Sequence, residues 1–132
     1  MAQQQFDVGI LGATGMVGQH LVRRLADHPW FRVAWLGASG RSSGRRFGDL
    51  PWRLPSPVPA EARDLVVEDP VPGRAPVLVF SAIDADAAAR LEPAFAAAGH
   101  ILVSNARPHR LDPDVPLLVP EIMARNFLVH LS

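Results

Sequence analysis

Four glycines recur at every third position near the start of the chain, at residues 9, 12, 15 and 18. The apolar run 6–11 that leads into them has the length and composition of a buried parallel strand. Residues 16–27 then carry apolar side chains at helical spacing, and residues 33–36 form a second apolar run. A strand, a glycine turn, a helix and a strand in this order predict a βαβ unit of about 30 residues, which restricts the fold to a parallel sheet flanked by helices.

The turn itself, residues 12–18, reads Gly-Ala-Thr-Gly-Met-Val-Gly. Glycine permits a sharp turn and lets the backbone approach a pyrophosphate closely, while the first turn of a helix offers free N–H donors and about half a positive charge. This segment therefore predicts a site for a dinucleotide phosphate. The alternative interpretation is a tight strand-to-helix connection that binds nothing.

The rest of the chain extends this unit. Short apolar runs bounded by proline or glycine predict further strands at 65–67, 77–80, 101–103 and 116–119. A helix is predicted over 85–98, and Pro93 is expected to kink or split it. The stretch 37–62 is rich in Gly, Ser, Arg and Pro and predicts a loop, with an edge strand at 52–54. The alternation predicts an α/β protein with a Rossmann-like, doubly wound, mostly parallel sheet.

We expect one domain over residues 1–121 and a separate tail over residues 122–132. The chain of 132 residues has the size of one domain with a single core. The tail is more apolar than a free end, because it contains Ile122, Met123, Phe127, Leu128 and Leu131. It is expected either to dock on a partner or to cover an open edge of the sheet, and a frame-shifted or prematurely stopped reading frame explains the same residues more simply.

Residues 38–46 follow the second predicted strand and read Ala-Ser-Gly-Arg-Ser-Ser-Gly-Arg-Arg. Enzymes that use NAD place an acid near this point, about 20 residues after the turn, to bind the ribose 2′-hydroxyl. Here the first carboxylate after the strand is Asp49. Serine hydroxyls and a forked guanidinium instead suit a 2′-phosphate, so the loop favours NADP. The alternative is a solvated surface loop of arginine and serine.

Composition excludes several function classes. Thirteen basic and thirteen acidic residues balance, so no overall field would draw the chain to nucleic acid or to a membrane surface. All basic residues are arginine, which excludes lysine Schiff-base chemistry. The lack of cysteine excludes disulfides, thiolate metal sites and thiol nucleophiles, and we expect no metal. The short, uncharged segment 1–5 is unlike a signal peptide, so a cytoplasmic location is expected.

These motifs together resemble the aspartate-semialdehyde dehydrogenase family, and most closely its archaeal and fungal type branch. The resemblance runs from about Phe6 to Glu121 and is most specific in the run Arg-Leu-Asp-Pro-Asp-Val-Pro-Leu-Leu-Val-Pro-Glu at 110–121. Its other parts are the glycine turn, Ser-Gly-Arg-Ser at 39–42, Phe-Ser-Ala at 80–82 and Ser-Asn at 104–105. The family reduces aspartyl phosphate to aspartate semialdehyde through a cysteine thioester that accepts hydride from NADPH.

The resemblance implies a set of NADP contacts. Pyrophosphate would be held by Gly12, Thr14, Gly15, Met16 and Val17. The 2′-phosphate would be bound by Ser39, Arg41 and Ser42, the dinucleotide cleft lined by Ser81 and Ala82, and the nicotinamide flanked by Asn105. Arg110 would bind the substrate or inorganic phosphate through a bidentate guanidinium, the alternative being a surface ion pair with Asp112 or Asp114.

The departures from the family limit the expected activity. The nucleophilic cysteine and the second domain of the family are not in this sequence, so we expect the chain to bind NADP without turning over alone. None of the five histidines pairs with a nucleophile at a recognisable spacing, and His109, beside Arg110, is interpreted as a loop residue. Two other interpretations remain open: a stand-alone NADP-binding or interaction module that pairs with itself or with a full-length relative, and a domain of a related reductase such as N-acetylglutamyl-phosphate reductase.

Overall fold

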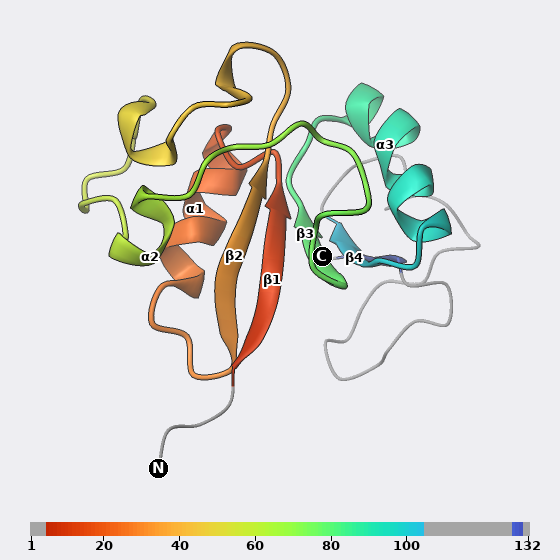
Figure 1. Cartoon of the computed structure of the whole chain (residues 1–132), viewed down its shortest axis with the longest axis horizontal. Helices are drawn as coiled ribbons and strands as arrows, with labels where there is room; N and C mark the ends of the chain where they lie inside the picture. Colours follow the sequence, from red (N-terminus) through yellow and green to blue (C-terminus); the bar gives the residue numbers. More distant parts are fainter. Residues whose placement is uncertain (1–4, 105–127, 131–132) are drawn as a thin grey trace.

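A computed structural model of the chain describes residues 5–104 and 128–130. Within them a five-stranded, fully parallel sheet has the strand order β2-β1-β3-β4-β5 (Figure 1). Its strands are β1 (Phe6–Leu11), β2 (Phe31–Gly37), β3 (Leu78–Ser81), β4 (Ile101–Ser104) and β5 (Leu128–His130). The helices are α1 (Met16–Leu25), α2 (Ala60–Arg63) and α3 (Ala85–Ala97), with short 3₁₀ turns η1 (Gly40–Ser42) and η2 (Phe47–Asp49). The predicted α/β fold with a doubly wound parallel sheet is confirmed.

The strand order reverses beside β1. The chain passes from β1 through α1 to β2 on one side, and then crosses back to β3 on the other side of β1. In open parallel sheets the crevice at such a reversal, at the carboxyl ends of the strands, is where ligands bind. The glycine turn begins directly after Leu11, the last residue of β1, so the fold places it at this crevice.

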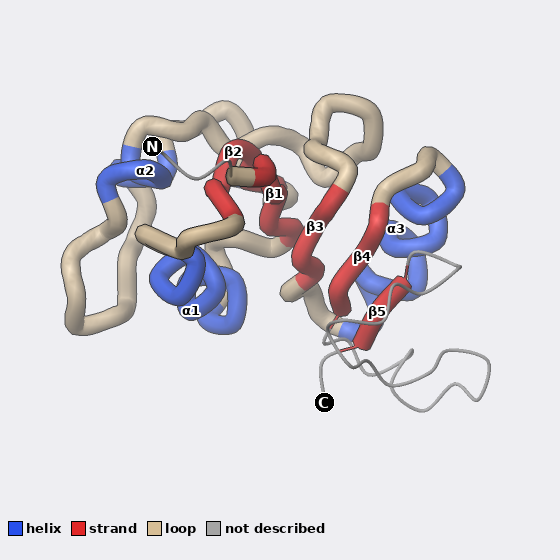
Figure 2. Tube along the Cα trace, turned by 90° about the horizontal axis from the view of Figure 1, so that it is seen from below, coloured by secondary structure: helices blue, strands red, loops and turns tan. Residues whose placement is uncertain are grey.

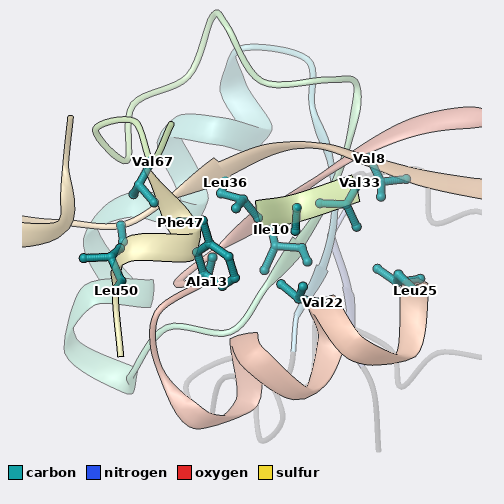
Figure 3. Packing of buried hydrophobic residues seen from close by; sticks show 12 residues of the cluster. Val8, Ile10, Ala13, Val22, Leu25, Val33, Leu36, Phe47, Leu50 and Val67 are labelled. Carbon is teal, nitrogen blue, oxygen red and sulfur yellow. The ribbon is translucent and has the colours of Figure 1, made fainter. Parts of the chain in front are cut away.

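Helices cover both faces of the sheet, with α1 and α3 on opposite sides (Figure 2). The core under α1 and the neighbouring loops is formed by the residues that Figure 3 draws, which are Val8, Ile10, Ala13, Val22, Leu25, Val33, Leu36, Ala38, Phe47, Leu50, Ala62 and Val67. The smaller core under α3 comprises Leu11, Trp35, Val79, Phe95 and Leu102. Because β1 pairs Val8 with Val33 but Gly9 with Trp35, a bulge in β2 at Ala34 sends Val33 and Trp35 into different cores.

Gly9 belongs to this packing and not to the turn. A Cβ on Gly9 would lie 2.8 Å from the Trp35 ring, and a Cβ on Gly37 would lie 2.2 Å from it. Trp35 therefore covers two glycines on neighbouring strands, and its ring lies 6.2 Å from that of Phe95 on α3. The every-third-residue glycine pattern thus combines one packing glycine with three turn glycines.

Four details of the sequence prediction are wrong. Residues 52–54 form no strand, and residues 65–67 form only an isolated antiparallel bridge between Val66 and Arg46. Helix α3 is continuous through Pro93, so the expected split is wrong, while a kink at Pro93 stays a prediction. Pro93 and Ala89, whose carbonyl loses its helical donor, are both exposed, so water can hydrate that carbonyl. Val17, expected on the apolar face of the helix, is 45% exposed.

The predicted strand 116–119 lies outside the described residues. The segment 128–130 pairs in parallel with β4, so part of the predicted tail contributes backbone to the sheet. Covering the sheet edge was one of the two roles considered for that tail, and the division at residue 121 stays a prediction. In the described part of the chain we find no helix with the length and hydrophobicity required to cross a membrane.

Candidate dinucleotide site

The first glycine of the turn has a backbone that only glycine adopts easily. Gly12 has φ of +86°, and a Cβ there would lie 2.8 Å from the carbonyl oxygen of Ala82, at the end of β3. The N–H groups of Gly12 and Ala13 both donate to the carbonyl of Gly37, at 2.7 and 3.2 Å. The turn is therefore fixed to the carboxyl ends of both strands that neighbour β1.

The last glycine lets α1 pack onto the turn. A Cβ on Gly18 would lie 2.1 Å from the carbonyl oxygen of Gly12, which no side chain can tolerate. Gly15 differs, because its nearest neighbour would be the same oxygen at 3.7 Å, and it is exposed. Gly12 and Gly18 thus shape the turn, while Gly15 leaves its outer side open.

Backbone donors collect on that open side. Within the described part of the chain, the N–H groups of Thr14, Met16 and Val17 have no acceptor, and no side chain caps α1 at Gly15. Met16 and Val17 are 44% and 45% exposed. Free N–H groups at the positive end of a helix, with no side chain above Gly15, provide the surroundings that a phosphate requires. All five residues assigned to pyrophosphate lie in this turn.

A buried glutamine ties the turn to a distant loop, which sequence reasoning missed. Gln19 is 1% exposed; its amide donates to the carbonyls of Thr14 and Pro51 at 3.1 and 3.0 Å, and its oxygen accepts from the N–H of Arg53 at 2.9 Å. Its position gave a signal, because it lies one helical turn before Val22 on the buried face of α1. A polar residue in an apolar stripe indicates a specific hydrogen-bonding partner.

The loop after β2 presents Arg41 to solvent. Arg41 lies in η1 next to Gly40, which has φ of +68°, and both residues are exposed. Of the described residues, none forms a hydrogen bond or an ion pair with the Arg41 side chain. Ser39 is exposed and Ser42 is half-buried in the same loop, so the three residues assigned to the 2′-phosphate lie within four positions of one another.

Arg46, in contrast, has a structural role. Its guanidinium contacts Asp49 at 3.0 Å and Asp64 at 2.5 Å. Hydrogen bonds to Asp49, and then to Asp64, raise the pKa of Arg46 above its ordinary value. Arg46 is thus engaged in ion pairs, whereas Arg41 has no partner in the part of the chain that the structure describes, and both interpretations of the loop, a 2′-phosphate site and a solvated surface loop, stay open.

A second segment, residues 65–69, lies alongside the loop 39–46, here called the arginine loop, and forms hydrogen bonds with its backbone. Gly44 and Phe47 donate to the carbonyls of Val67 and Leu65, at 2.7 and 2.8 Å, and the N–H of Val67 donates back to the loop. At its end, the Ser43 hydroxyl donates to Asp69 at 2.5 Å. Residues 65–67 of this segment were predicted as a strand, and the role of the segment as a brace for the loop was missed because the pairing joins residues about 20 positions apart.

The β3 end of the predicted cleft is built differently from the expectation. Ser81 is 2% exposed and its hydroxyl donates to Glu92 of α3 at 2.5 Å, so this side chain points into the interior. Ala82 is half-buried and lies against Gly12. Glu92, fully buried, was not predicted to have any role.

Asn105 and Arg110, assigned to the nicotinamide and to the substrate phosphate, lie outside the described residues, as does His109. Among the described residues no group of three histidine, aspartate or glutamate side chains could hold a metal ion. The roles given to individual residues therefore stay predictions. The turn 12–18 and the arginine loop are the parts of the candidate site that the structure describes.

A separate hollow of about 340 Å³ lies at the other end of α1, lined by Arg23, Ala26, Asp27, Ser56, Pro57, Val58, Pro59, Ala60 and Glu61. It contains none of the predicted site residues. Burial, followed by the charge of Asp27, raises the pKa of Glu61, while the backbone N–H of Val33 and the charge of Arg32 oppose the shift. The Glu61 carboxylate thus lies at the edge of the sheet, where it accepts from β2.

Comparison with known proteins gives consistent matches. Residues 7–129 match the family described as the semialdehyde dehydrogenase, NAD binding domain. The chain is 45% identical to the aspartate-semialdehyde dehydrogenase of Archaeoglobus fulgidus and 47% identical to that of Cryptococcus neoformans, covering 89% and 88% of this chain but 35% and 33% of those proteins. A crystal structure of the Candida albicans aspartate-semialdehyde dehydrogenase with NADP superposes with a TM-score of 0.82 at 41% identity, over 88% of this chain and 34% of that one. The chain thus spans about a third of the length of these relatives.

Proposed function

Because this chain belongs to the semialdehyde dehydrogenase family and matches its NAD-binding domain, we propose that it is the NADP-binding domain of an aspartate-semialdehyde dehydrogenase. The observation that carries the proposal is the row of N–H donors at Thr14, Met16 and Val17, which have no acceptor among the described residues, in a turn shaped by glycines that admit no side chain. Such a row matches the pyrophosphate of a dinucleotide in both charge and hydrogen bonding.

The described residues fit this cofactor. The open side of Gly15 leaves room for a phosphate. A Cβ on Gly12 or Gly18 would overlap backbone atoms and distort the turn. When bound, NADPH supplies the hydride for the reduction of an acyl group, and the chain's own contribution is to bind and orient the dinucleotide. The proposed substrate of the whole enzyme is aspartyl phosphate, on the similarity to the aspartate-semialdehyde dehydrogenases.

The acids near the end of β2 support a preference for NADP over NAD. Asp49, the first carboxylate after that strand, is paired with Arg46. The segment 65–69, here called the brace, contains two further acids that lie beside the arginine loop. Of these, Asp69 accepts a hydrogen bond from Ser43, and Glu68 lies 3.8 Å from Arg74. Each of these acids already has an arginine or serine partner, whereas Arg41, with no partner among the described residues, is a suitable donor to a 2′-phosphate.

Calorimetric titration of the chain with NADPH and NADH tests the proposal. We expect NADPH to bind about 10- to 100-fold more tightly than NADH, the effect of one or two charge-assisted hydrogen bonds, and Arg41→Ala to remove most of that difference. Arg45→Ala, which changes the neighbouring exposed arginine, is the matched control and should leave the preference intact. Equal affinity for the two dinucleotides, or a preference that depends on Arg45 alone, would contradict the assignment.

Turnover by this chain alone is not part of the proposal. The sequence contains no cysteine to form the acyl-enzyme of the family reaction. With aspartate semialdehyde, inorganic phosphate and NADP, we therefore expect no NADPH above background. Measurable, enzyme-dependent NADPH production would require another nucleophile and would overturn this part of the proposal.

We also propose that the chain associates, with a second copy or with a full-length relative. Phe6 and Trp30 are 64% and 56% exposed at the amino-terminal edge of the sheet, and a backbone hydrogen bond of 2.7 Å joins them. Exposed aromatic side chains at one end of the sheet favour burial against another surface. Sedimentation equilibrium tests this, and a monomer that persists at high concentration would limit association to a full-length partner.

A further inference from the structure

A single carboxylate oxygen joins α3 to the ends of two strands. Glu92 is fully buried, and its Oε2 accepts hydrogen bonds from the hydroxyls of Ser81 at 2.5 Å and Ser104 at 2.7 Å. The two serines are register partners and are the last residues of β3 and β4. This contact therefore lies at the carboxyl edge of the sheet, where the candidate site is, and not in the middle of the core.

Stability alone is a weak reason for a carboxylate in this position. Removing a glutamate side chain from water is costly, and an apolar side chain of the same volume would pack there without that cost. A buried acid with two specific donors does, however, fix distances, because each donor must stay within hydrogen-bond reach of one atom. Here it fixes the ends of β3 and β4 relative to α3.

The end of β3 is also the support of the glycine turn. Ala82 follows Ser81, and its N–H donates to the carbonyl of Leu11, directly before the turn, at 2.7 Å. A Cβ on Gly12 would lie 2.8 Å from the Ala82 carbonyl oxygen and 2.9 Å from Cγ2 of Ile83. The hydrogen bond from Ala82 to Leu11, together with the close approach of Ala82 to Gly12, couples the position of Ala82 to that of the turn.

We propose that Glu92 is a positioning residue for the dinucleotide: through Ser81 and Ala82 it sets the geometry of the turn that begins at Gly12, and through Ser104 it holds the end of the neighbouring strand. The inference rests on the proposed function for its consequence in binding. Glu92 itself lies in the interior and donates nothing to the cofactor. Its action is to keep the backbone donors of the turn aimed at one place.

The test compares two substitutions at this position in the full chain. Glu92→Met fills the same volume without an acceptor, whereas Glu92→Gln keeps an oxygen that both serines can reach. We expect Glu92→Met to weaken NADPH binding about 3- to 10-fold, as the misplacement of about one hydrogen bond would do, and Glu92→Gln to restore most of the affinity. In the nucleotide-free protein, the ¹⁵N–¹H resonances of Gly12 and Ala82 should shift in Glu92→Met and not in Glu92→Gln.

Phe95→Leu is the matched control, because Phe95 is buried one turn further along α3 under Trp35 and bonds to neither strand end. It should lower the melting temperature while NADPH affinity stays unchanged, because Phe95 forms no side-chain hydrogen bond to the ends of β3 and β4. The inference is overturned if Glu92→Met lowers only the melting temperature and leaves the Gly12 and Ala82 resonances and the affinity as in the wild type. If Glu92→Met does not fold, Ser81→Ala decides in its place, because it removes the hydrogen bond through which Glu92 holds the end of β3; a smaller shift of the same resonances supports the inference and none overturns it.

If the wild-type chain binds no dinucleotide, the proposed function fails by itself. The nucleotide-free spectra still decide whether Glu92 sets the geometry of the turn. A shift at Gly12 in Glu92→Met without any NADPH binding in the wild type would keep the structural link and remove its proposed purpose. No shift, with wild-type binding intact, would remove the link and keep the function.

Discussion

Two glycine-containing loops meet the same edge of the sheet and are built in different ways. In the turn 12–18, a Cβ on Gly12 or Gly18 would overlap backbone atoms at 2.8 and 2.1 Å. In the arginine loop 39–46, a Cβ on Gly40 or Gly44 would meet nothing within 4 Å. Glycine is therefore required in the turn for space, and in the loop only for a positive φ.

The difference separates two parts of cofactor recognition. The turn is part of the packed interior, since it is held by β2, by β3 and by Gln19 of α1. The arginine loop is held from outside by the brace at residues 65–69 and presents its side chains to solvent. We expect changes in the turn to reduce both stability and affinity, and changes in the loop to alter the choice between NADP and NAD with little effect on stability.

The largest expected effect comes from Gly18→Ala. The added methyl group would lie 2.1 Å from the Gly12 carbonyl oxygen, so α1 must move away from the turn. We expect a loss of about 3 kcal/mol or more in the free energy of unfolding, together with loss of dinucleotide binding. Urea denaturation and calorimetric titration measure the two effects.

Gly15→Ala is the matched control for this change, because its methyl group would meet only one atom, at 3.7 Å. Its unfolding free energy should stay within about 1 kcal/mol of the wild type. If both substitutions destabilised the chain equally, steric packing would not distinguish the glycines of the turn, and the comparison with the arginine loop would lose its basis.

Gln19→Leu should have the next largest effect. It leaves the carbonyls of Thr14 and Pro51 and the N–H of Arg53 without their buried partner, and we expect a loss of about 2 kcal/mol in unfolding free energy. Arg24→Leu, on the exposed side of the same helix, should change it by less than about 0.5 kcal/mol. A stable Gln19→Leu protein would show that the turn does not depend on the 51–53 segment.

The same contrast explains how far the sequence could be interpreted. Local patterns predicted β1, α1, β2 and the glycine turn. These elements follow one another in the chain, and the form of each is determined by the apolar residues or glycines within it. The brace was missed because Val67 and Arg45, about 20 residues apart, are joined by a hydrogen bond between backbone groups. Such a bond does not require particular side chains and therefore leaves no pattern in the sequence. Glu92 was missed for a related reason. From the sequence, an acid in a helix is expected on the solvent-exposed face, and only the fold shows that two serines donate hydrogen bonds to it.

Gly40→Ala should affect the arginine loop without affecting the turn. The new methyl group meets no atom within 4 Å, so the only cost is that of placing an L-residue at φ of +68°. We expect about 1 kcal/mol of destabilisation and a weaker preference for NADPH, with affinity for NADH unchanged because η1 is reshaped and the turn is not. Gly40→Asn, which tolerates positive φ better, should be nearer to the wild type in both. Equal weakening of NADPH and NADH binding would mean that the two loops act as one unit.

The smallest expected effect, from Glu61→Gln, lies away from both loops and tests their independence of the rest of the chain. Burial and Asp27 raise the pKa of Glu61 above its ordinary value of 4.5, so between these two values the folded chain binds more protons than the unfolded chain. Stability therefore falls as pH rises from about 4.5 through the pKa of the folded state, and at neutral pH this cost is fully present.

Glutamine at position 61 removes this cost of burying a charged group. Since the group is partly exposed, we expect only about 1 °C of added melting temperature at pH 7, and this gain should disappear below pH 4.5. Scanning calorimetry across pH measures this difference. A difference that grows towards low pH would contradict a raised pKa of Glu61. A change in NADPH affinity at pH 7 would show that the hollow between α1 and α2 is coupled to the turn at the other end of the helix.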